Sequence, residues 1–316
     1  MQDTFDVAPG ISAIDTHMLD RYQVTSAYLV RGAEPALIET GPATSAPSVL
    51  AGLRMLGFDP GDLAHLIVTH IHLDHAGGVG TLADAFPSAT IWVHERGAPH
   101  LADPTKLVAS TARAYGGLDR IRSFYGDVLP APADRIRAAG EGERISLGDR
   151  TLDVFETPGH ASHHLCLVDS DTGAVFTGDA LGVHIPDVGV LRPAVPPPDV
   201  DVDAGVASIR RIRERGRLLL LSHFGSVAPV EHFCELAEKR LLAWSETVRR
   251  ALLTDADVEE ITDLLTQQGS REYETDAGEP IDMEKYDVLS SIRMNGAGLA
   301  RYWSKRPDTD PPSTPA

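Results

Sequence analysis

The chain has 316 residues, which is enough for one large domain or for one domain with an extension. Hydrophobic residues make up 42% and charged residues 23%, as is ordinary for a globular protein. Acidic residues outnumber basic ones by 46 to 28, which gives a formal charge of −18. This excess argues against a nucleic-acid partner, because that kind of binding depends on Lys and Arg.

The chain shows no feature of a membrane or secreted protein. No run approaches the ~18 consecutive apolar residues of a membrane span, so no membrane partner is expected. The first residues lack the basic and apolar regions of a secretory signal. Cys166 and Cys234 are too few for a disulfide framework. We therefore expect a cytoplasmic protein with reduced cysteines.

Strand and helix patterns alternate in the first half of the chain. Short apolar runs predict strands at residues 11–14, 26–30, 36–39, 63–69 and 90–93. Helical periodicity is predicted over 45–57 and again up to Phe86. Residues 95–140 are less regular, with short helical patterns around 105–115 and 118–126.

The second half changes character near residue 229. Before it, the patterns predict strands at 150–156, 165–168, 174–177 and 217–222, a Pro-rich loop at 183–199 and a helix at 201–214. After it, only helical patterns occur, at about 230–253, 255–268 and 283–303. We therefore predict an α/β body over residues 1–228, a helical extension over 229–305 that packs near the site, and a disordered tail over 306–316.

Three histidines and an aspartate gather directly after the strand at 63–69. His70 and His72 lie two residues apart, so in extended chain they point to the same side and can reach one metal ion. Asp74 and His75 follow where the chain turns toward a helix, and they can face a second position nearby. Packing four such groups together without a cation would cost several kcal/mol. The cluster therefore predicts a metal site.

This segment, THIHLDHAGG over residues 69–78, resembles the signature of the metallo-β-lactamase superfamily. Further segments resemble its downstream signatures in the same order, and an upstream Glu-Thr-Gly-Pro run at 39–42 resembles its Asp-Thr-Gly turn. The downstream segments are Thr-Pro-Gly-His at 157–160, Thr-Gly-Asp-Ala at 177–180 and Ser-His-Phe-Gly at 222–225. The resemblance covers residues ~10–228. It implies a four-layer αββα sandwich, whereas the patterns alone show only mixed α/β structure.

The resemblance also implies a ligand set for two metal ions. Its first site would be held by His70, His72 and His160. Its second site would be held by Asp74, His75 and His223, with Asp179 bridging both. Zinc is the expected metal, and iron or manganese also suits His and Asp ligands.

The reaction implied is hydrolysis of an ester-like bond of a small-molecule substrate by a metal-bridging hydroxide. The motifs are closest to the glyoxalase II-like branch, so a thioester such as a hydroxyacylglutathione, or another small acyl ester, is the first expectation. A lactonase, a mononuclear iron sulfur dioxygenase and a noncatalytic scaffold remain alternatives. A basic pocket would favour an acyl-glutathione or acyl-CoA substrate.

Further residues are candidates for catalysis, for support of the metal ligands and for the substrate pocket. Asp74 could orient the nucleophile as well as bind metal, and His184 could polarise the substrate carbonyl as a second catalytic residue. Glu39 is expected to hydrogen-bond a ligand histidine or its loop, and His163 and Arg192 are candidates for the substrate pocket. The apolar stripe of the helical extension suits a lid or a dimer surface, which leaves a homodimer open.

Overall fold

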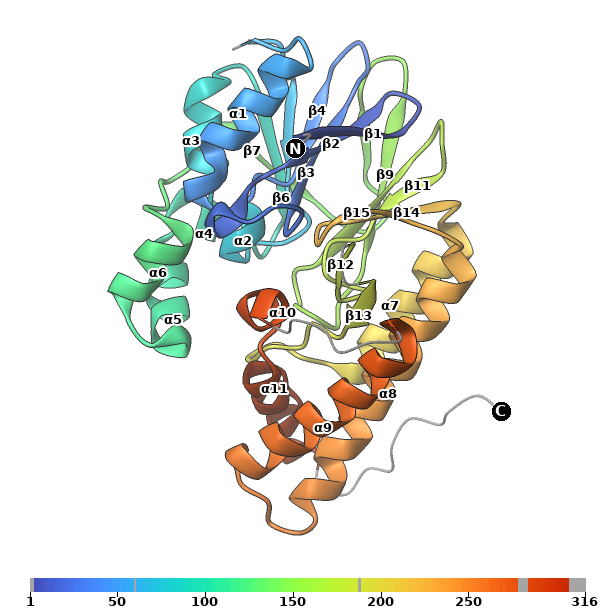
Figure 1. The fold of residues 1–316 in the computed structure, drawn as a ribbon. Coiled ribbons are helices and arrows are strands. Elements are labelled where there is room, and N and C mark those ends of the chain that lie inside the picture. The colour runs from blue at the N-terminus through green and yellow to red at the C-terminus, as the bar shows by residue number, and fades with distance from the viewer. Residues whose placement is uncertain (1–2, 60, 187–188, 278–283, 307–316) are drawn as a thin grey trace.

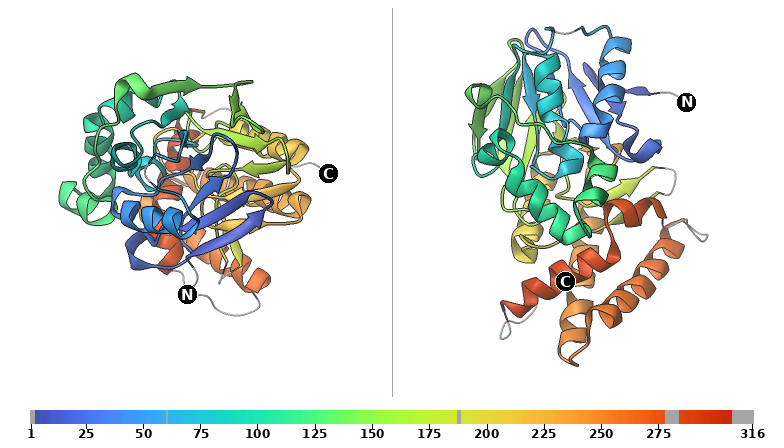
Figure 2. Two further views of the ribbon diagram at one scale, coloured as in Figure 1. Left: turned by 90° about the horizontal axis from the view of Figure 1, so that it is seen from above. Right: turned by 90° about the vertical axis from the view of Figure 1, so that its left-hand side faces the viewer.

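The computed structural model describes residues 3–59, 61–186, 189–277 and 284–306 (Figure 1). The tail predicted to be disordered, apart from Arg306, lies outside these residues. Two sheets occupy one end of the molecule and the C-terminal helices gather at the other (Figure 2). Among the described residues, no helix has the length and apolar character needed to cross a membrane.

The first sheet has seven strands in the same order as the chain. They are β1 (Thr4–Ala8), β2 (Ile11–Asp15), β3 (Ser26–Val30), β4 (Ala36–Ile38), β5 (His65–Ile67), β6 (Thr90–His94) and β7 (Ile136–Ala139). β1 to β4 are antiparallel neighbours, whereas β4 to β7 run parallel. The parallel arrangement brings the ends of β4 and β5 to one edge of the sheet, where Glu39 and the His70–His75 segment follow them.

The second sheet has six strands in the order β15-β14-β11-β10-β9-β8. They are β8 (Arg144–Ser146), β9 (Thr151–Glu156), β10 (Leu165–Asp169), β11 (Ala174–Phe176), β14 (Leu218–Leu221) and β15 (Gly225–Val227). β12 (Val183–Ile185) and β13 (Val190–Arg192) form a separate two-stranded hairpin. The segments with the other predicted ligands follow β9, β11 and β14, so this sheet also presents its residues at strand ends.

Alternating side chains on each strand build the two sides of a sheet. In β3, Tyr28 and Val30 belong to a core that also contains Leu167 and Phe176 of the second sheet, so the sheets pack face to face. Leu29 of the same strand points the other way, into a core formed with helices. Helices cover the outer face of each sheet, which confirms the four-layer αββα sandwich.

The α-helices differ in what they cover. They are α1 (Ala46–Met55), α2 (Leu73–Ala76), α3 (Val79–Ala85), α4 (Ala98–Ala102), α5 (Thr105–Tyr115), α6 (Leu118–Tyr125), α7 (Val202–Arg215), α8 (Val230–Leu252), α9 (Val258–Ala277), α10 (Glu284–Leu289) and α11 (Ile292–Ser304). Within the described ranges there are also three short 3₁₀ turns: η1 (Met18–Asp20), η2 (Ala43–Ser45) and η3 (Ala133–Arg135). Helices α1 and α3 pack on the first sheet, and α5 with α6 projects beside it (Figure 1).

One apolar core joins the second sheet to the C-terminal helices. It contains Val175 and Leu219 of the sheet, Trp244 of α8 and Leu299 of α11, all completely buried. Complete burial of a Trp or Leu side chain contributes roughly 1.5–3 kcal/mol to stability. The extension is therefore packed on the body through a continuous core.

Two predictions about the chain after residue 180 are wrong in detail. The segment 183–199 is not a simple loop, because β12 and β13 pair across a turn and pack Val183 and Val190 against Tyr273 and Tyr286 of the extension. The helix predicted over 283–303 is two helices, interrupted at Ser290 and Ser291. The hydroxyl of Ser290 donates to the carbonyl oxygen of Pro193 at 2.7 Å, so this break docks the extension on the body.

Candidate metal centre and substrate cavity

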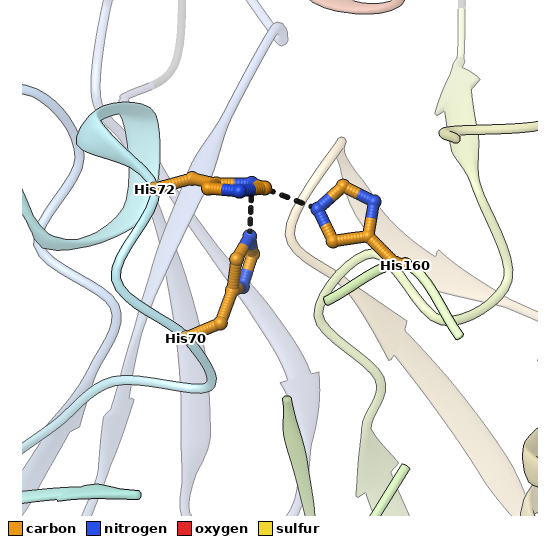
Figure 3. A group of neighbouring side chains, drawn as sticks. All are labelled: His70, His72 and His160. Carbon is orange, nitrogen blue, oxygen red and sulfur yellow. Dashed lines mark hydrogen bonds between the residues drawn. The ribbon is translucent and has the colours of Figure 1, made fainter. Parts of the chain in front are cut away.

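The first predicted group of ligands converges on one point. The Nε2 atom of His70 lies 3.1 Å from Nδ1 of His72, and Nε2 of His160 lies 2.8 Å from the same atom (Figure 3). His70 and His72 leave the end of β5, while His160 comes from the loop after β9. A single N–H at Nδ1 of His72 cannot donate a hydrogen bond to both of the other nitrogens. Three nitrogens this close together favour a shared cation.

The second predicted group lies beside the first. The Oδ2 atom of Asp74 is 3.6 Å from Nε2 of His75 and 3.6 Å from Nε2 of His223. Asp179 lies between the groups: Oδ1 is 3.3 Å from His75 and 3.2 Å from His223, while Oδ2 is 3.6 Å from His160. The two oxygens of Asp179 thus face different groups, as a bridging carboxylate must.

Hydrogen bonds on the outer side of the imidazole rings fix which nitrogen faces inward. His160 donates from Nδ1 to the carbonyl oxygen of Ala194 at 2.7 Å, and His223 donates from Nδ1 to that of Val24 at 3.2 Å. A carbonyl can only accept, so in the neutral imidazole Nε2 carries the lone pair, and this atom is directed into the site. This is the tautomer that a metal ligand needs.

Several inward atoms lie close to one another but make no hydrogen bond of normal geometry. Nε2 of His75, Nε2 of His223 and Oδ1 of Asp179 are buried and accept no hydrogen bond within the described protein. Leaving such buried polar atoms unsatisfied costs about 1–3 kcal/mol each. Because all three converge on the space beside Asp74, the residues present fit a divalent cation there and a second one at the three-histidine group.

Glu39 occupies the position that the sequence analysis expected for it. Its carboxylate lies 3.2 Å from Nδ1 of His75 and accepts hydrogen bonds from the hydroxyls of Thr69 at 2.5 Å and Ser222 at 2.9 Å. The side chain is almost completely buried. It therefore orients a ligand histidine and links β5 to the loop after β14, a supporting role that is common around metal sites.

His164 fixes the backbone of the bridging carboxylate. Its Nδ1 is 2.7 Å from the hydroxyl of Thr157, and its Nε2 accepts the backbone N–H of Asp179 at 3.0 Å. Gly178 has a φ of +50°, and a Cβ there would come within 2.4 Å of this Nε2. The glycine is needed both for its backbone conformation and for the close approach of the imidazole.

Burial and charge divide the imidazoles into two kinds. Burial, reinforced by the neighbouring imidazoles, holds the pKa values of His70 and His72 well below the usual range. Burial also acts to lower the pKa of His75 and His223, but the Asp179 carboxylate outweighs it and raises both. These imidazoles in turn hold the pKa of Asp179 well below its ordinary value, against the effect of burial. Cation binding at the second group therefore competes with protons.

An open cavity of about 360 Å³ adjoins this centre. His72, Asp74, His160 and Asp179 form its inner end. Its walls come mainly from four parts of the chain: the segment from Arg96 to Tyr125, residues 162–163, the proline loop 194–199, and residues 289–295 from the end of α10 to the start of α11. The predicted helical extension therefore contributes directly to the space in front of the candidate metal ligands.

Asn295 holds the extension against the proline loop. Its side-chain oxygen accepts the N–H of Val195, and its amide nitrogen donates to the carbonyl oxygen of Pro193, both at 2.8 Å. Gly298, one helical turn later, leaves room for the carbonyl oxygen of Val195, which a Cβ would approach to 2.0 Å. The position of this cavity wall thus depends on tight backbone packing.

The structure places the remaining predicted residues differently. His163 lines the cavity, with its ring 5.9 Å from that of His72, as the sequence analysis expected. His184 does not line it: the ring lies against Phe233 of α8, so the expected role at the substrate carbonyl is wrong. The reason is that β12 pairs with β13 and turns this side chain toward the extension.

Arg192 is also absent from the cavity wall. The side chain is completely buried, donates to the Tyr273 hydroxyl and to the Ser290 carbonyl oxygen at 2.8 Å each, and pairs with Asp287 at 2.8 Å. Its guanidinium also lies 4.9 Å from the ring centre of Tyr286. These contacts make it a link between β13 and the extension rather than a substrate ligand.

Sequence reasoning did not identify the basic and hydroxyl-bearing residues of the cavity. Arg96, His100 and Lys106 line it, together with Ser110 and Thr111 of α5. They lie in the irregular segment 95–140, where no motif marks them. The helical pattern over residues 105–115 predicts that these side chains share one face of a helix. It does not predict that this face borders the cavity.

Comparison with known proteins agrees with this centre. The family model described as "Metallo-beta-lactamase superfamily" matches residues 20–223. The chain belongs to the metallo-β-lactamase superfamily. This match spans the segments that supply all of the candidate ligands.

Individual members of the superfamily resemble the chain at low identity. The metallo-β-lactamase fold-containing protein ST1585 of Sulfurisphaera tokodaii is 24% identical over 73% of this chain and 85% of its own length. Its crystal structure superposes with a TM-score of 0.65 over 92% of this chain and 98% of that one, at 21% identity. At this identity the superposition shows the fold alone.

Superfamily members whose names state an activity match over a shorter length. An acyl-coenzyme A thioesterase of Gallus gallus is 31% identical over 54% of this chain and 63% of its own. A hydroxyacylglutathione hydrolase of Rhodospirillum rubrum is 28% identical over 54% of this chain and 53% of its own. The chain thus spans little more than half the length of these relatives.

Proposed function

We propose that this protein is a metal-dependent hydrolase that cleaves an ester-like bond, with a thioester as the first substrate class. The observation that carries the proposal is Asp179, whose two carboxylate oxygens face the two groups of inward-pointing imidazole nitrogens. Such an arrangement suits two divalent cations, with zinc as the expected metal and iron or manganese as alternatives. His70, His72 and His160 would hold one, and Asp74, His75 and His223 the other.

Two cations held there would supply Lewis acidity and a water nucleophile of lowered pKa. The chain itself contributes positioning. His160 and His223 are oriented by backbone carbonyls, and His75 by Glu39, so their Nε2 atoms point into the site before any cation binds. Asp74 lies at the inner end of the cavity, where its carboxylate can accept a hydrogen bond from the attacking water. The cavity accommodates the substrate in front of these groups.

Two findings support a thioester over other ester-like bonds. Superfamily relatives named as thioesterases or hydroxyacylglutathione hydrolases align with this chain. In addition, the cationic side chains of Arg96 and Lys106 line the cavity, and anionic thiol carriers would find favourable charges there.

The test combines metal analysis with a substrate panel. The purified full chain, supplied with zinc, iron or manganese, is assayed for bound metal and for hydrolysis of thioesters, lactones and phosphodiesters. We expect about two ions per chain and turnover of thioesters. H72A should lose turnover and the ion of the three-histidine group. The matched control is H232A, which removes an exposed histidine of α8. One iron per chain without hydrolysis would support a dioxygenase instead, and no metal with no turnover would support a scaffold.

A further inference from the structure

Helix α5 presents one continuous face to the cavity. The residues that line the cavity from this helix are Lys106, Leu107, Ser110, Thr111, Ala114 and Tyr115. Successive residues of this set are alternately one and three positions apart, which places them along a single side of an α-helix. Tyr115 is nine positions after Lys106, and at a rise of 1.5 Å per residue this face is about 14 Å long.

The Tyr115 end of this face lies toward the candidate metal centre. Tyr115 packs against the apolar cluster that contains Leu73, the residue directly before Asp74. Burial, together with the Asp74 and Asp179 carboxylates, raises the pKa of Tyr115 to about 12, so the phenol stays protonated and senses both carboxylates of the centre. The α5 face therefore begins beside the site where the bond would be cleaved.

The opposite end of the face is cationic. Lys106 is exposed and lines the cavity. Its ammonium group forms no ion pair within 4.0 Å with another described residue. His100 lines the cavity as well, and Asp103 is near both, with its carboxylate accepting the N–H of Thr105 at 3.1 Å. Arg96 adds a second fixed positive charge and donates to the carbonyl oxygen of Ser162 at 3.3 Å.

Among the described residues that line the cavity outside the metal centre, Asp199 is the one carboxylate. It accepts a hydrogen bond from Ser162 at 2.7 Å and faces His163. This part of the cavity wall therefore has two permanent positive charges, Arg96 and Lys106, and one negative charge. The whole chain has the opposite balance, with a net charge of −18. The cavity wall is therefore suited to an anion although the protein as a whole repels one.

We propose that the cavity binds an elongated ester-like substrate with an anionic group about 14 Å from the bond that is cleaved. The anion would lie at Lys106, the reacting bond at the Tyr115 end, and the connecting arm along Ser110, Thr111 and Ala114. The hydroxyl and methyl side chains of these three residues leave room for such an arm. This inference rests on the proposed hydrolytic function, because it assigns the reacting bond to the metal centre.

The test uses the metal-loaded full chain and matched thioesters of increasing acyl length. In the first two series the thiol is small and neutral, and the acyl chain ends either in a methyl group or in a carboxylate. In a second pair of series the acyl chain ends in a methyl group, and the thiol either is neutral or carries a carboxylate. We expect kcat/KM to favour the carboxylate by about 2- to 5-fold at one preferred length, because KM falls. The preference should disappear in K106Q and remain in R113Q, which removes an exposed cation of α5 that does not line the cavity.

A binding measurement separates this inference from the proposed function. Calorimetry with an α,ω-dicarboxylate of the preferred length, compared with the monocarboxylate, does not require turnover. Tighter binding of the dicarboxylate that is lost in K106Q supports the anionic subsite even if no thioester is cleaved. Equal binding of both acids, or an advantage that survives K106Q, overturns it, whereas hydrolysis of neutral thioesters would still support the proposed function.

Discussion

Replacing Arg192 by methionine tests whether the extension is attached to the body as described. Methionine keeps much of the buried aliphatic volume but removes every donor of the guanidinium. Without the guanidinium, the Tyr273 hydroxyl and the Ser290 carbonyl oxygen each lose the hydrogen bond that they accept from Arg192. Both residues are buried. The Asp287 carboxylate is about half exposed, so water can replace that contact at little cost.

The magnitude follows from the two buried contacts. Hydrogen bonds to a charged group contribute about 1.5–3 kcal/mol each, so R192M should lose roughly 3–6 kcal/mol of unfolding free energy. Urea denaturation followed by circular dichroism measures this loss as a lower midpoint. The control is R144M, which breaks a pair between exposed side chains, Arg144 and Asp153, and should cost less than about 1 kcal/mol.

Kinetics on the same variant decide between a structural and a substrate-binding role. If Arg192 links β13 to the extension, R192M folded at low temperature should retain the KM of the natural chain to within a few-fold. A variant with an unchanged urea midpoint and a KM raised for anionic substrates alone would refute this reasoning. It would show that the guanidinium meets the substrate.

Three further outcomes are expected. E39Q should weaken metal affinity 10- to 100-fold in a chelator competition, because the amide no longer fixes His75 as the carboxylate does; unchanged affinity would contradict that role. G298A should raise KM more than it lowers kcat, since a Cβ would collide with the Val195 carbonyl and displace the cavity wall, and an unchanged KM would count against this packing. Burial lowers the pKa of His163 to about 4, below the 6.5 of the unfolded chain, so its neutral form stabilises the fold above pH 6.5. This contribution is lost as the pH falls from 6.5 to 4, and urea titrations of H163N should show a shallower decline over that range than those of the natural chain.

Local geometry predicts only part of the candidate ligand set, and the resemblance to the superfamily signatures supplies His160, Asp179 and His223. His70 and His72 follow a short buried strand, so alternation alone directs both to one side. His160, Asp179 and His223 each follow a strand of the second sheet, and parallel or neighbouring strands bring their ends to one edge. The strand ends therefore fix the centre whatever the loops between them do.

The residues that were placed wrongly depend on contacts that sequence patterns do not reveal. His184 and Arg192 lie in a segment whose prolines suggest a loop, yet β12 and β13 pair there. What stabilises this hairpin is the burial of Val183 and Val190 against aromatic rings about 90 residues later in the chain. No local pattern contains that information, and the pairing decides that both side chains face the extension.

The same distinction separates the chemistry of this protein from its specificity. The candidate ligands depend on two sheets whose packing is set by alternation, so the proposed reaction class rests on short motifs. The cavity walls depend on α5 and on the docking of α11 through Asn295 and Gly298, which are tertiary contacts between distant segments. A change in α5 can therefore alter the charge and length of the cavity while the ligands stay in place. For this reason substrate preference should respond to Lys106 and metal affinity should not.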